Sequence, residues 1–298
     1  MNHIYIVNCS LPYLFEGVEG CQLMNCNGRI SLARRLMNRF GRESVVPENM
    51  SSYDRLKDAD CVIFFADTTR FLLRCRHIEE VVPQTAVLHL YLWNPASYYD
   101  EWISDVGSRW HVWTFSEEES LRHGMLYGET FYNKDLAFAS SVDTDLFFVG
   151  LDKGRKFILT QLAQSAKAQG LTADIRIVDT IRSRFSRAYS PRMGYDDVRK
   201  HIASSRTIID IVQKGQTGLT QRVVESLFFR KKLITNNQRI TKAPFYSRSN
   251  IFLLGVDRME DLGEFVRSPY EVSEFDADHY DVRKWMERML NTREFNGQ

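Results

Sequence analysis

Two Gly-rich segments in the second half of the chain place cationic side chains beside the expected start of a helix. The first is Phe148–Lys156, in which an apolar run ends at Gly150 and a helix is expected from about Gly154. Glycine lets a backbone approach a ligand closely, and a helix N-terminus offers N–H groups and a positive dipole end to an anion. Lys153 and Arg155 add positive charge. This chemistry suits a diphosphate, and the alternative is an ordinary turn with solvated cations.

The second segment is Asp210–Glu225, where another apolar run passes through a Gly-rich loop into a helix. Arg222 and Glu225 are three residues apart and therefore share one helix face. A carboxylate can accept two hydroxyl hydrogen bonds, so Glu225 suits a ribose while the helix tip suits a phosphate. The alternative is a surface ion pair worth about 0.3 kcal/mol. The residues at the helix tip are Gly218, Leu219 and Thr220.

Carboxylates in the first half are candidates for a general base. Asp67 directly follows the apolar run Cys61–Ala66, and ligands of open α/β sheets bind at the carboxyl ends of strands. Glu16 and Glu19 lie in a long loop after the first strand and compete for this role. A solvated or helix-capping carboxylate is the alternative for each. His89 lies within an apolar run, which favours a core position over catalysis.

Acidic and cysteine patterns give no reason to expect a metal site. Asp143-Thr144-Asp145 has the D-x-D spacing, but it precedes an apolar strand, whereas metal-binding pairs of this kind follow one. The same spacing occurs at Asp58-Ala59-Asp60 and at Asp276-Ala277-Asp278, so it arises freely here. The five cysteines include no C-x-x-C pair. We therefore expect no bound metal and no cofactor.

Short apolar runs alternate with helical patterns along most of the chain. This alternation predicts βαβ units, and runs that are apolar throughout indicate parallel strands covered on both faces. The predicted strands are Ile4–Asn8, Cys61–Ala66, Ala86–Trp93, Trp110–Phe115, Leu146–Gly150, Ile175–Val178, Thr207–Val212, Leu233–Thr235 and Ile251–Leu254. Predicted helices include Gly28–Phe40, Gly154–Gln169, Tyr195–Ser205 and Leu219–Lys231.

The chain is long enough for two α/β domains, each with its own core. It has 298 residues, of which 44% are hydrophobic and 26% charged. A polar stretch over Asn133–Thr144 marks the expected boundary, which gives domains at 1–140 and 141–275. The segment 276–298 has apolar residues at helical spacing and is expected to be a helix that packs on the first domain.

The second domain resembles a known enzyme group. The run Gln216–Glu225, followed by Lys231–Asn237, is similar to the donor-domain signature of bacterial capsule and lipopolysaccharide glycosyltransferases. Phe147–Arg155 resembles the start of that domain, and Trp113–Ser120 with Phe131-Tyr132 resembles the segment before it. The likeness covers about residues 110–255 and concerns a loosely defined group. Many enzymes of this kind have a glycine-rich loop after the first strand of the N-terminal domain. Here that loop, Cys9–Gly20, has two glycines but no clear glycine-rich motif.

This resemblance implies a GT-B fold, with two Rossmann-like domains facing each other across a cleft. The C-terminal domain would hold a nucleotide-sugar donor, expected to be a nucleoside diphosphate sugar, and the N-terminal domain a glycan acceptor. By the same resemblance, Glu225 would bind the ribose, while Arg222, Lys153 and Arg155 would face the diphosphate. The base would be Asp67 or Glu16. Without a metal, cations and helix N–H groups would stabilise the leaving diphosphate.

The basic segment Arg176–Arg206 allows a further partner. It has eight cationic residues, with Phe185 and Tyr189 among them. The functional interpretation is a loop near the donor phosphates or a contact for an anionic acceptor, free or lipid-linked, and the alternative is a solvated loop. Nucleic acid is not expected, because the formal net charge of the whole chain is only +1.

Neither a signal peptide nor an apolar run of membrane-spanning length is visible, so we expect a cytoplasmic enzyme with, at most, peripheral contact at the inner face of the membrane.

Two competing classes of function remain open. A nucleotide-sugar epimerase on the same fold would share the donor site but need no acceptor. A non-catalytic carbohydrate-binding or partner-binding protein would bind nucleotide weakly and would not depend on Glu225.

Overall fold

The computed structural model describes residues 3–24, 50–66, 71–99, 103–178, 189–213, 216, 218–272 and 274–292. Its chain forms two compact units, Met1–Glu129 with Met289–Gln298, and Thr130–Arg288. The helix expected over Gly28–Phe40 lies outside the described residues.

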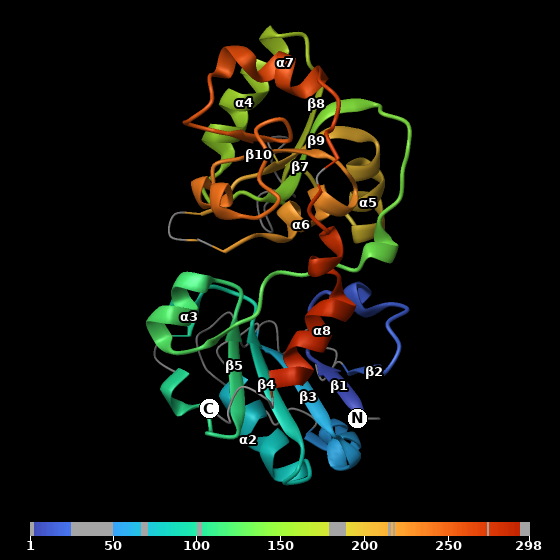
Figure 1. Cartoon of the computed structure of the whole chain (residues 1–298), viewed down its shortest axis with the longest axis vertical. Helices are drawn as coiled ribbons and strands as arrows, with labels where there is room; N and C mark the ends of the chain where they lie inside the picture. The colour runs from blue at the N-terminus through green and yellow to red at the C-terminus, as the bar shows by residue number, and fades with distance from the viewer. Residues whose placement is uncertain are drawn as a thin grey trace. The chain divides into compact units, whose positions relative to one another are not determined.

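The first unit contains a parallel sheet, whose six described strands have the order β2-β1-β3-β4-β5-β6 (Figure 1). The strands are β1 (Ile4–Val7), β2 (Cys21–Met24), β3 (Cys61–Ala66), β4 (Val87–Leu92), β5 (Trp110–Thr114) and β6 (Leu126–Tyr127). The helices described with them are α2 (Phe71–Val81) and α3 (Glu117–His123), and the 3₁₀ helices are η1 (Pro12–Phe15), η2 (Met50–Asp58), η3 (Ala96–Tyr98) and η4 (Ile103–Asp105).

The second unit repeats this plan with five described parallel strands in the order β11-β10-β9-β7-β8. They are β7 (Thr144–Leu151), β8 (Ala173–Val178), β9 (Ser205–Asp210), β10 (Lys232–Thr235) and β11 (Ile251–Leu253). The helices are α4 (Lys156–Ala168), α5 (Tyr195–Ala203), α6 (Gln221–Phe228), α7 (Leu262–Arg267) and α8 (Val282–Leu290), whose last residues belong to the first unit. The 3₁₀ helices are η5 (Lys134–Leu136), η7 (Gln238–Lys242), η8 (Met259–Asp261) and η9 (Ala277–Tyr280).

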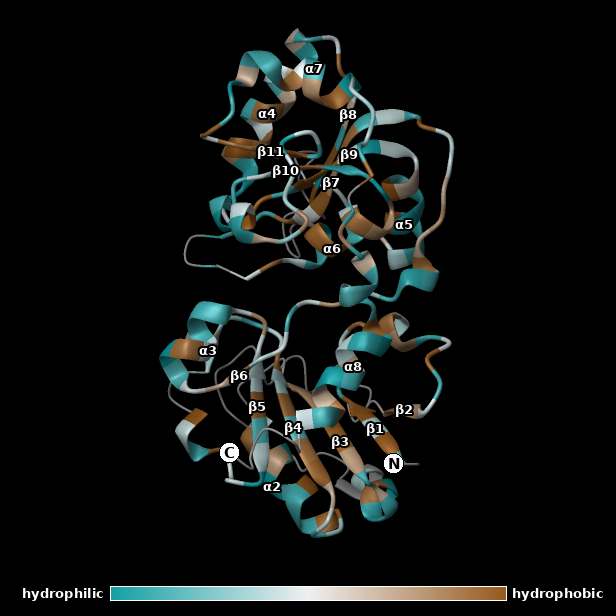
Figure 2. Cartoon of the chain, viewed as in Figure 1, coloured by the Kyte–Doolittle hydropathy of each residue, from teal (hydrophilic) through white to brown (hydrophobic). Residues whose placement is uncertain are grey.

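Alternating side chains of the second sheet pack against different helices. Leu146 and Phe148 of β7 belong to a buried cluster with apolar residues of α4 and α7. Phe147, which lies between them in the sequence, stacks instead on His201 of α5, with ring centroids 5.2 Å apart. Helices therefore cover both faces of the sheet, as its apolar strands predict. Figure 2 shows the same apolar character in β1 and β3 of the first sheet.

Local geometry defines the ends of two helices. Ser116 accepts a hydrogen bond from the Glu119 amide at the start of α3. Gly170 follows α4 with a φ of 71°, the left-handed conformation that favours glycine after a helix. Asp257 does not cap a helix: its carboxylate accepts from the Leu253 amide, and η8 begins after Arg258.

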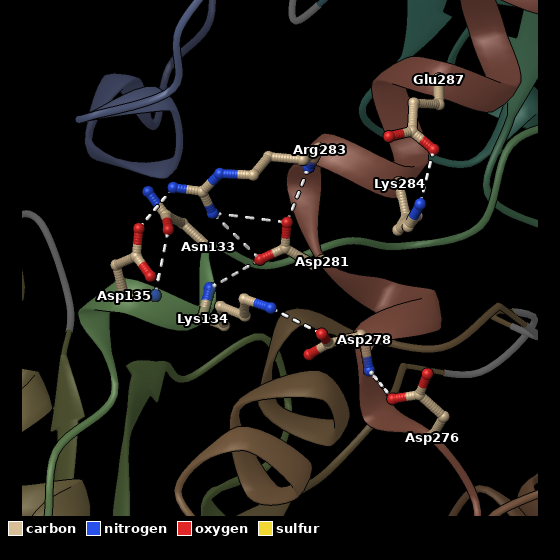
Figure 3. A network of polar contacts seen from close by, with 9 residues as sticks. All are labelled: Asn133, Lys134, Asp135, Asp276, Asp278, Asp281, Arg283, Lys284 and Glu287. Carbon is tan, nitrogen blue, oxygen red and sulfur yellow. Dashed lines mark hydrogen bonds and ion pairs between the residues drawn. The ribbon is translucent and has the colours of Figure 1, made fainter.

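Within the second unit, the segment Thr130–Leu136 lies beside the segment Asp276–Arg283. Tyr132 donates its amide proton to the Tyr280 carbonyl (2.8 Å), and its own carbonyl accepts from the Val282 amide (2.7 Å). Phe131 stacks on Trp285, with ring centroids 4.0 Å apart. Figure 3 shows the polar network that joins the same two segments. None of the helices in the described ranges has the length and apolar character needed to cross a bilayer.

Candidate nucleotide-binding site

Strand order creates a topological switch point at the carboxyl end of the second sheet. The chain runs from β7 to β8 on one side and then to β9 on the other, so the loops after β7 and β9 leave in opposite directions. Such a switch point is where open α/β sheets bind ligands. The two Gly-rich segments singled out from the sequence follow these two strands. The structure therefore brings the predicted donor-binding residues of both segments to one edge of one sheet.

The loop after β7 is a tight turn held by Asp152. Lys153 and Gly154 both have positive φ, at 42° and 81°. Asp152 accepts at its carbonyl from the Arg155 amide (2.7 Å) and at Oδ1 from the Lys156 amide (3.2 Å). A left-handed conformation is unusual for lysine, and residues held in this way are frequent at functional sites. The turn fixes where Lys153 and Arg155 leave the backbone.

The Arg155 guanidinium lies against Gly150, at the end of β7. A Cβ added at Gly150 would lie 3.4 Å from Arg155 Nη1. The Nε atom of Arg155 is buried and has no hydrogen-bond partner among the described residues. Burial lowers the pKa of this guanidinium, Asp210 opposes that shift, and Arg222 adds to it. Burial and the nearby Arg155 likewise lower the pKa of Lys153. Lys153 and Arg155 therefore place positive charge at this edge of the sheet, which suits an anionic ligand.

Asp210, the last residue of β9, lies at the same edge but was not among the predicted site residues. Its carboxylate is buried and accepts from the hydroxyls of Thr220 (2.9 Å) and Thr235 (3.3 Å). Burial raises its pKa, and the two hydroxyls, Arg155 and Arg222 oppose that rise. An acidic residue that ends an apolar strand before a Gly-rich loop is the sequence signal that could have identified it.

Thr220 precedes α6, and its neighbours anchor the loop that leads into this helix. Leu219 accepts at its carbonyl from the Thr130 hydroxyl (2.5 Å), and Gly218 is buried. Gln221 donates through Nε2 to the Phe131 carbonyl (3.3 Å). The start of α6 is therefore fixed by contacts to the segment that precedes β7.

Arg222 and Glu225 form an ion pair that is largely buried. The side chain of Glu225 is 1% exposed and that of Arg222 21%. Arg222 also donates through Nη2 to the Val149 carbonyl (3.4 Å), which places its guanidinium beside β7. The other carboxylate oxygen of Glu225 accepts from the Tyr195 hydroxyl (2.8 Å). The interpretation as a solvated surface pair is therefore wrong.

The other candidates lie elsewhere. Glu16 and Glu19 are exposed in the first unit, and Asp67 lies outside the described residues. His89 is buried in β4 and accepts from Trp113 Nε1 (3.0 Å), a core environment. Asp145 is at the start of β7, opposite the switch-point edge, where it pairs with Arg206 (3.1 Å). In the described ranges, no three His, Cys, Asp or Glu side chains form a group that could hold a metal ion.

In the described part of the basic segment, most cationic side chains form ion pairs with carboxylates. Arg176 pairs with Asp174 (2.9 Å), and Lys200 pairs with Asp197 (3.1 Å). The same carboxylate of Asp174 lies 3.2 Å from His201. These pairs favour a solvated surface for this part, while Arg182, Arg184 and Arg187 lie outside the described residues.

The whole chain is similar to solved structures of two glycosyltransferases and an epimerase. A glycosyltransferase from Rickettsia africae ESF-5 matches with a TM-score of 0.56 and 12% identity, over 99% of each chain. AviGT4, a glycosyltransferase involved in avilamycin A biosynthesis, matches with a TM-score of 0.52 and 12% identity, over 99% of this chain and 98% of that one. UDP-GlcNAc 2-epimerase from Methanocaldococcus jannaschii matches with a TM-score of 0.52 and 11% identity, over 99% of this chain and 100% of that one.

This chain has the GT-B fold. Two parallel sheets flanked by helices, together with these full-length matches, confirm the fold class predicted from the sequence. The sequence itself matches no established family profile and no curated protein. At identities of 11–12%, the likeness concerns the GT-B fold and not the reaction.

Proposed function

We propose that this protein is a glycosyltransferase that uses a nucleoside diphosphate sugar without a bound metal. The observation that supports it is the group of Lys153, Arg155 and Arg222 at the switch point of the second sheet, in a chain with the GT-B fold. When the bond between the sugar and the diphosphate of the donor breaks, negative charge develops on the diphosphate. Preorganised cations in a partly buried site stabilise that charge strongly. Arginine adds a planar fork that matches phosphate oxygens.

The proposed donor site uses the residues of both loops. Lys153 and Arg155 contact the diphosphate from the loop after β7, and Arg222 contacts it from α6. The backbone at the start of α6 offers N–H groups to the same anion. Glu225 belongs to this site either through the ribose or through Arg222. The loop residues that complete the proposed donor site are Gly218, Leu219 and Thr220.

The proposed acceptor is a growing surface polysaccharide or another glycan, free or lipid-linked. This part rests on the resemblance of the sequence to capsule and lipopolysaccharide enzymes. Asp67 and Glu16 are the proposed bases that take the proton from the acceptor hydroxyl. The proposed location is the cytoplasm or the inner face of the membrane.

Ligand binding without metal tests the donor site. Nucleoside mono- and diphosphates are titrated calorimetrically, in the presence of EDTA, into the wild-type protein and Arg155→Met. We expect one nucleoside diphosphate to bind, and the variant to bind it at least about tenfold more weakly, because a charge-assisted hydrogen bond contributes about 1.5–3 kcal/mol. Arg176→Met is the matched control, since this arginine already has a carboxylate partner, and its affinity should stay within about twofold of wild type.

Two outcomes would change the proposal. Absence of binding by every nucleotide would favour the non-catalytic class. If the nucleotide binds, its sugar conjugates are incubated with the protein and the products separated. Release of a rearranged sugar without any acceptor would identify the epimerase reaction instead.

A further inference from the structure

The environment of Glu225 differs from that of a ribose ligand. A carboxylate that binds ribose hydroxyls needs an oxygen that the ligand can reach. The side chain of Glu225 is only 1% exposed. One oxygen pairs with Arg222 Nη1, and the other accepts from Tyr195 Oη at 2.8 Å. Both oxygens are therefore directed at groups of the protein itself.

Two tyrosine hydroxyls form a hydrogen-bonded network with the Glu225 carboxylate. Tyr195 Oη lies 2.7 Å from Tyr132 Oη. Because the Tyr195 proton is donated to Glu225, Tyr132 donates its own proton to Tyr195. The Tyr132 ring lies beside the rings of Phe228 (5.7 Å between centroids) and Phe229 (6.2 Å), which restrict its movement. The network therefore ends at Tyr132, which is buried within the second unit.

The other end of this hydrogen-bonded network is the Arg222 guanidinium. Its Nη1 atom pairs with Glu225, and its Nη2 atom donates to the Val149 carbonyl in β7. Arg222 is also close enough to Arg155 to lower the pKa of that guanidinium. Two guanidinium groups repel each other, so a structure that keeps them close needs a carboxylate to hold one of them in place. Glu225 and Asp210 are the carboxylates in this position.

We propose that Glu225 is a positioning residue, held by Tyr195, that aims Arg222 at the diphosphate of the donor, and that it does not bind the ribose. This inference rests on the proposed function and departs from the role that the sequence resemblance implies for Glu225. It makes a specific claim about recognition: loss of Glu225 weakens contact with the phosphates, whether or not a ribose is attached to them.

Inorganic pyrophosphate separates the two roles because it has phosphates but no ribose. Pyrophosphate and the nucleoside diphosphate that binds wild type are titrated into wild type, Glu225→Gln, Arg222→Met and the double variant. We expect Glu225→Gln to weaken both ligands by the same factor, about tenfold. Arg222→Met should do the same, and the double variant should bind no more weakly than Arg222→Met alone, since Glu225 acts through Arg222.

The opposite pattern would overturn the inference. If Glu225→Gln weakens the nucleoside diphosphate but leaves pyrophosphate unchanged, Glu225 contacts the ribose. Additive losses in the double variant would also contradict a role through Arg222. If wild type binds neither pyrophosphate nor any nucleoside diphosphate, the proposed function itself fails, which is a different result from either of these.

A milder variant guards against misfolding of Glu225→Gln. Tyr195→Phe keeps the ring and the carboxylate but removes the hydroxyl that orients it. We expect it to weaken pyrophosphate and the nucleoside diphosphate by one common factor, about two- to fivefold. The ratio of the two affinities is the decisive readout, because a general loss of stability would not change it in a ligand-dependent way. A change in that ratio would count against the inference even if Glu225→Gln does not fold.

Discussion

Gly150 shows how a single residue can set the position of a cation. A Cβ added there would lie 3.1 Å from Phe148 Cζ and 3.4 Å from Arg155 Nη1. The contact with Phe148 is tight and the one with Arg155 is at the limit of ordinary van der Waals contact, and the packed Phe148 ring can yield less than the long arginine side chain. We therefore expect Gly150→Ala to displace the Arg155 guanidinium and to weaken pyrophosphate binding about three- to tenfold. Calorimetric titration of the folded variant measures this loss.

Gly170→Ala is the control for Gly150→Ala. Gly170 has a φ of 71°, and of the residues that the structure describes only Arg267 Nη2, at 3.8 Å, is near an added Cβ. Its replacement should lower stability by about 1 kcal/mol through backbone strain, and pyrophosphate affinity should stay unchanged. Equal losses of affinity in the two variants would show that the effect of Gly150→Ala comes from general destabilisation.

The sequence predicted those site residues that local spacing brings together. Arg222 and Glu225 are one helical turn apart, so their pairing follows from helix geometry alone. Tyr195 and Tyr132 were not predicted, because they are 30 and 63 residues away from the groups that they contact. Burial of the pair also depends on this tertiary packing. For that reason the sequence could not distinguish a ribose ligand from a carboxylate that is already occupied.

At the scale of elements, Asp281 joins the start of α8 to the segment before β7 (Figure 3). Its buried carboxylate accepts from the Arg283 amide (2.9 Å), as an N-cap does, and from the Lys134 amide (3.2 Å). We expect Asp281→Ala to lower the free energy of unfolding by about 2–3 kcal/mol, because it removes a cap and leaves a backbone N–H without its partner. Urea unfolding measures this change.

Asp278→Ala is the matched control in the same network. Asp278 pairs with Lys134 Nζ at 2.5 Å, but the two side chains are 47% and 41% exposed. Exposed ion pairs contribute little, so the loss should be below about 1 kcal/mol. Similar losses for the two variants would mean that the buried contacts of Asp281 do not determine the stability of this junction.

Apolar runs predicted most strands well, since buried parallel strands are hydrophobic on both faces. The prediction for β3 agrees with the structure at both ends, Cys61 and Ala66. The edge strands β2 and β6 were not predicted. In β2, Gln22 and Leu23 are exposed, and β6 has only two residues, so neither shows an apolar run. Strands of this kind form because a neighbouring strand offers hydrogen bonds, and a local pattern does not contain that information.

At the scale of the whole molecule, each unit has its own core. The cluster that contains Tyr5, Phe64 and Leu90 is confined to the first unit, and the cluster that contains Phe148, Leu162 and Ile209 to the second. The second unit is one continuous stretch, Thr130–Arg288, whereas the first is built from two stretches. All residues of the proposed donor site belong to the second unit. Binding of a diphosphate should therefore stabilise a defined part of the chain.

Hydrogen exchange followed by mass spectrometry measures which part is stabilised. A ligand that binds only the folded form slows exchange through openings that destroy its site. With saturating pyrophosphate, we expect slower exchange in β7, the start of α4, β9 and α6, and unchanged exchange in β3 and β4. Protection centred on β3 and β4 would place the anion site in the first unit and contradict the assignment of Lys153, Arg155 and Arg222. Protection in the second unit that is lost in Arg155→Met would link it to the guanidinium beside Gly150, because that variant changes no other cation of the site.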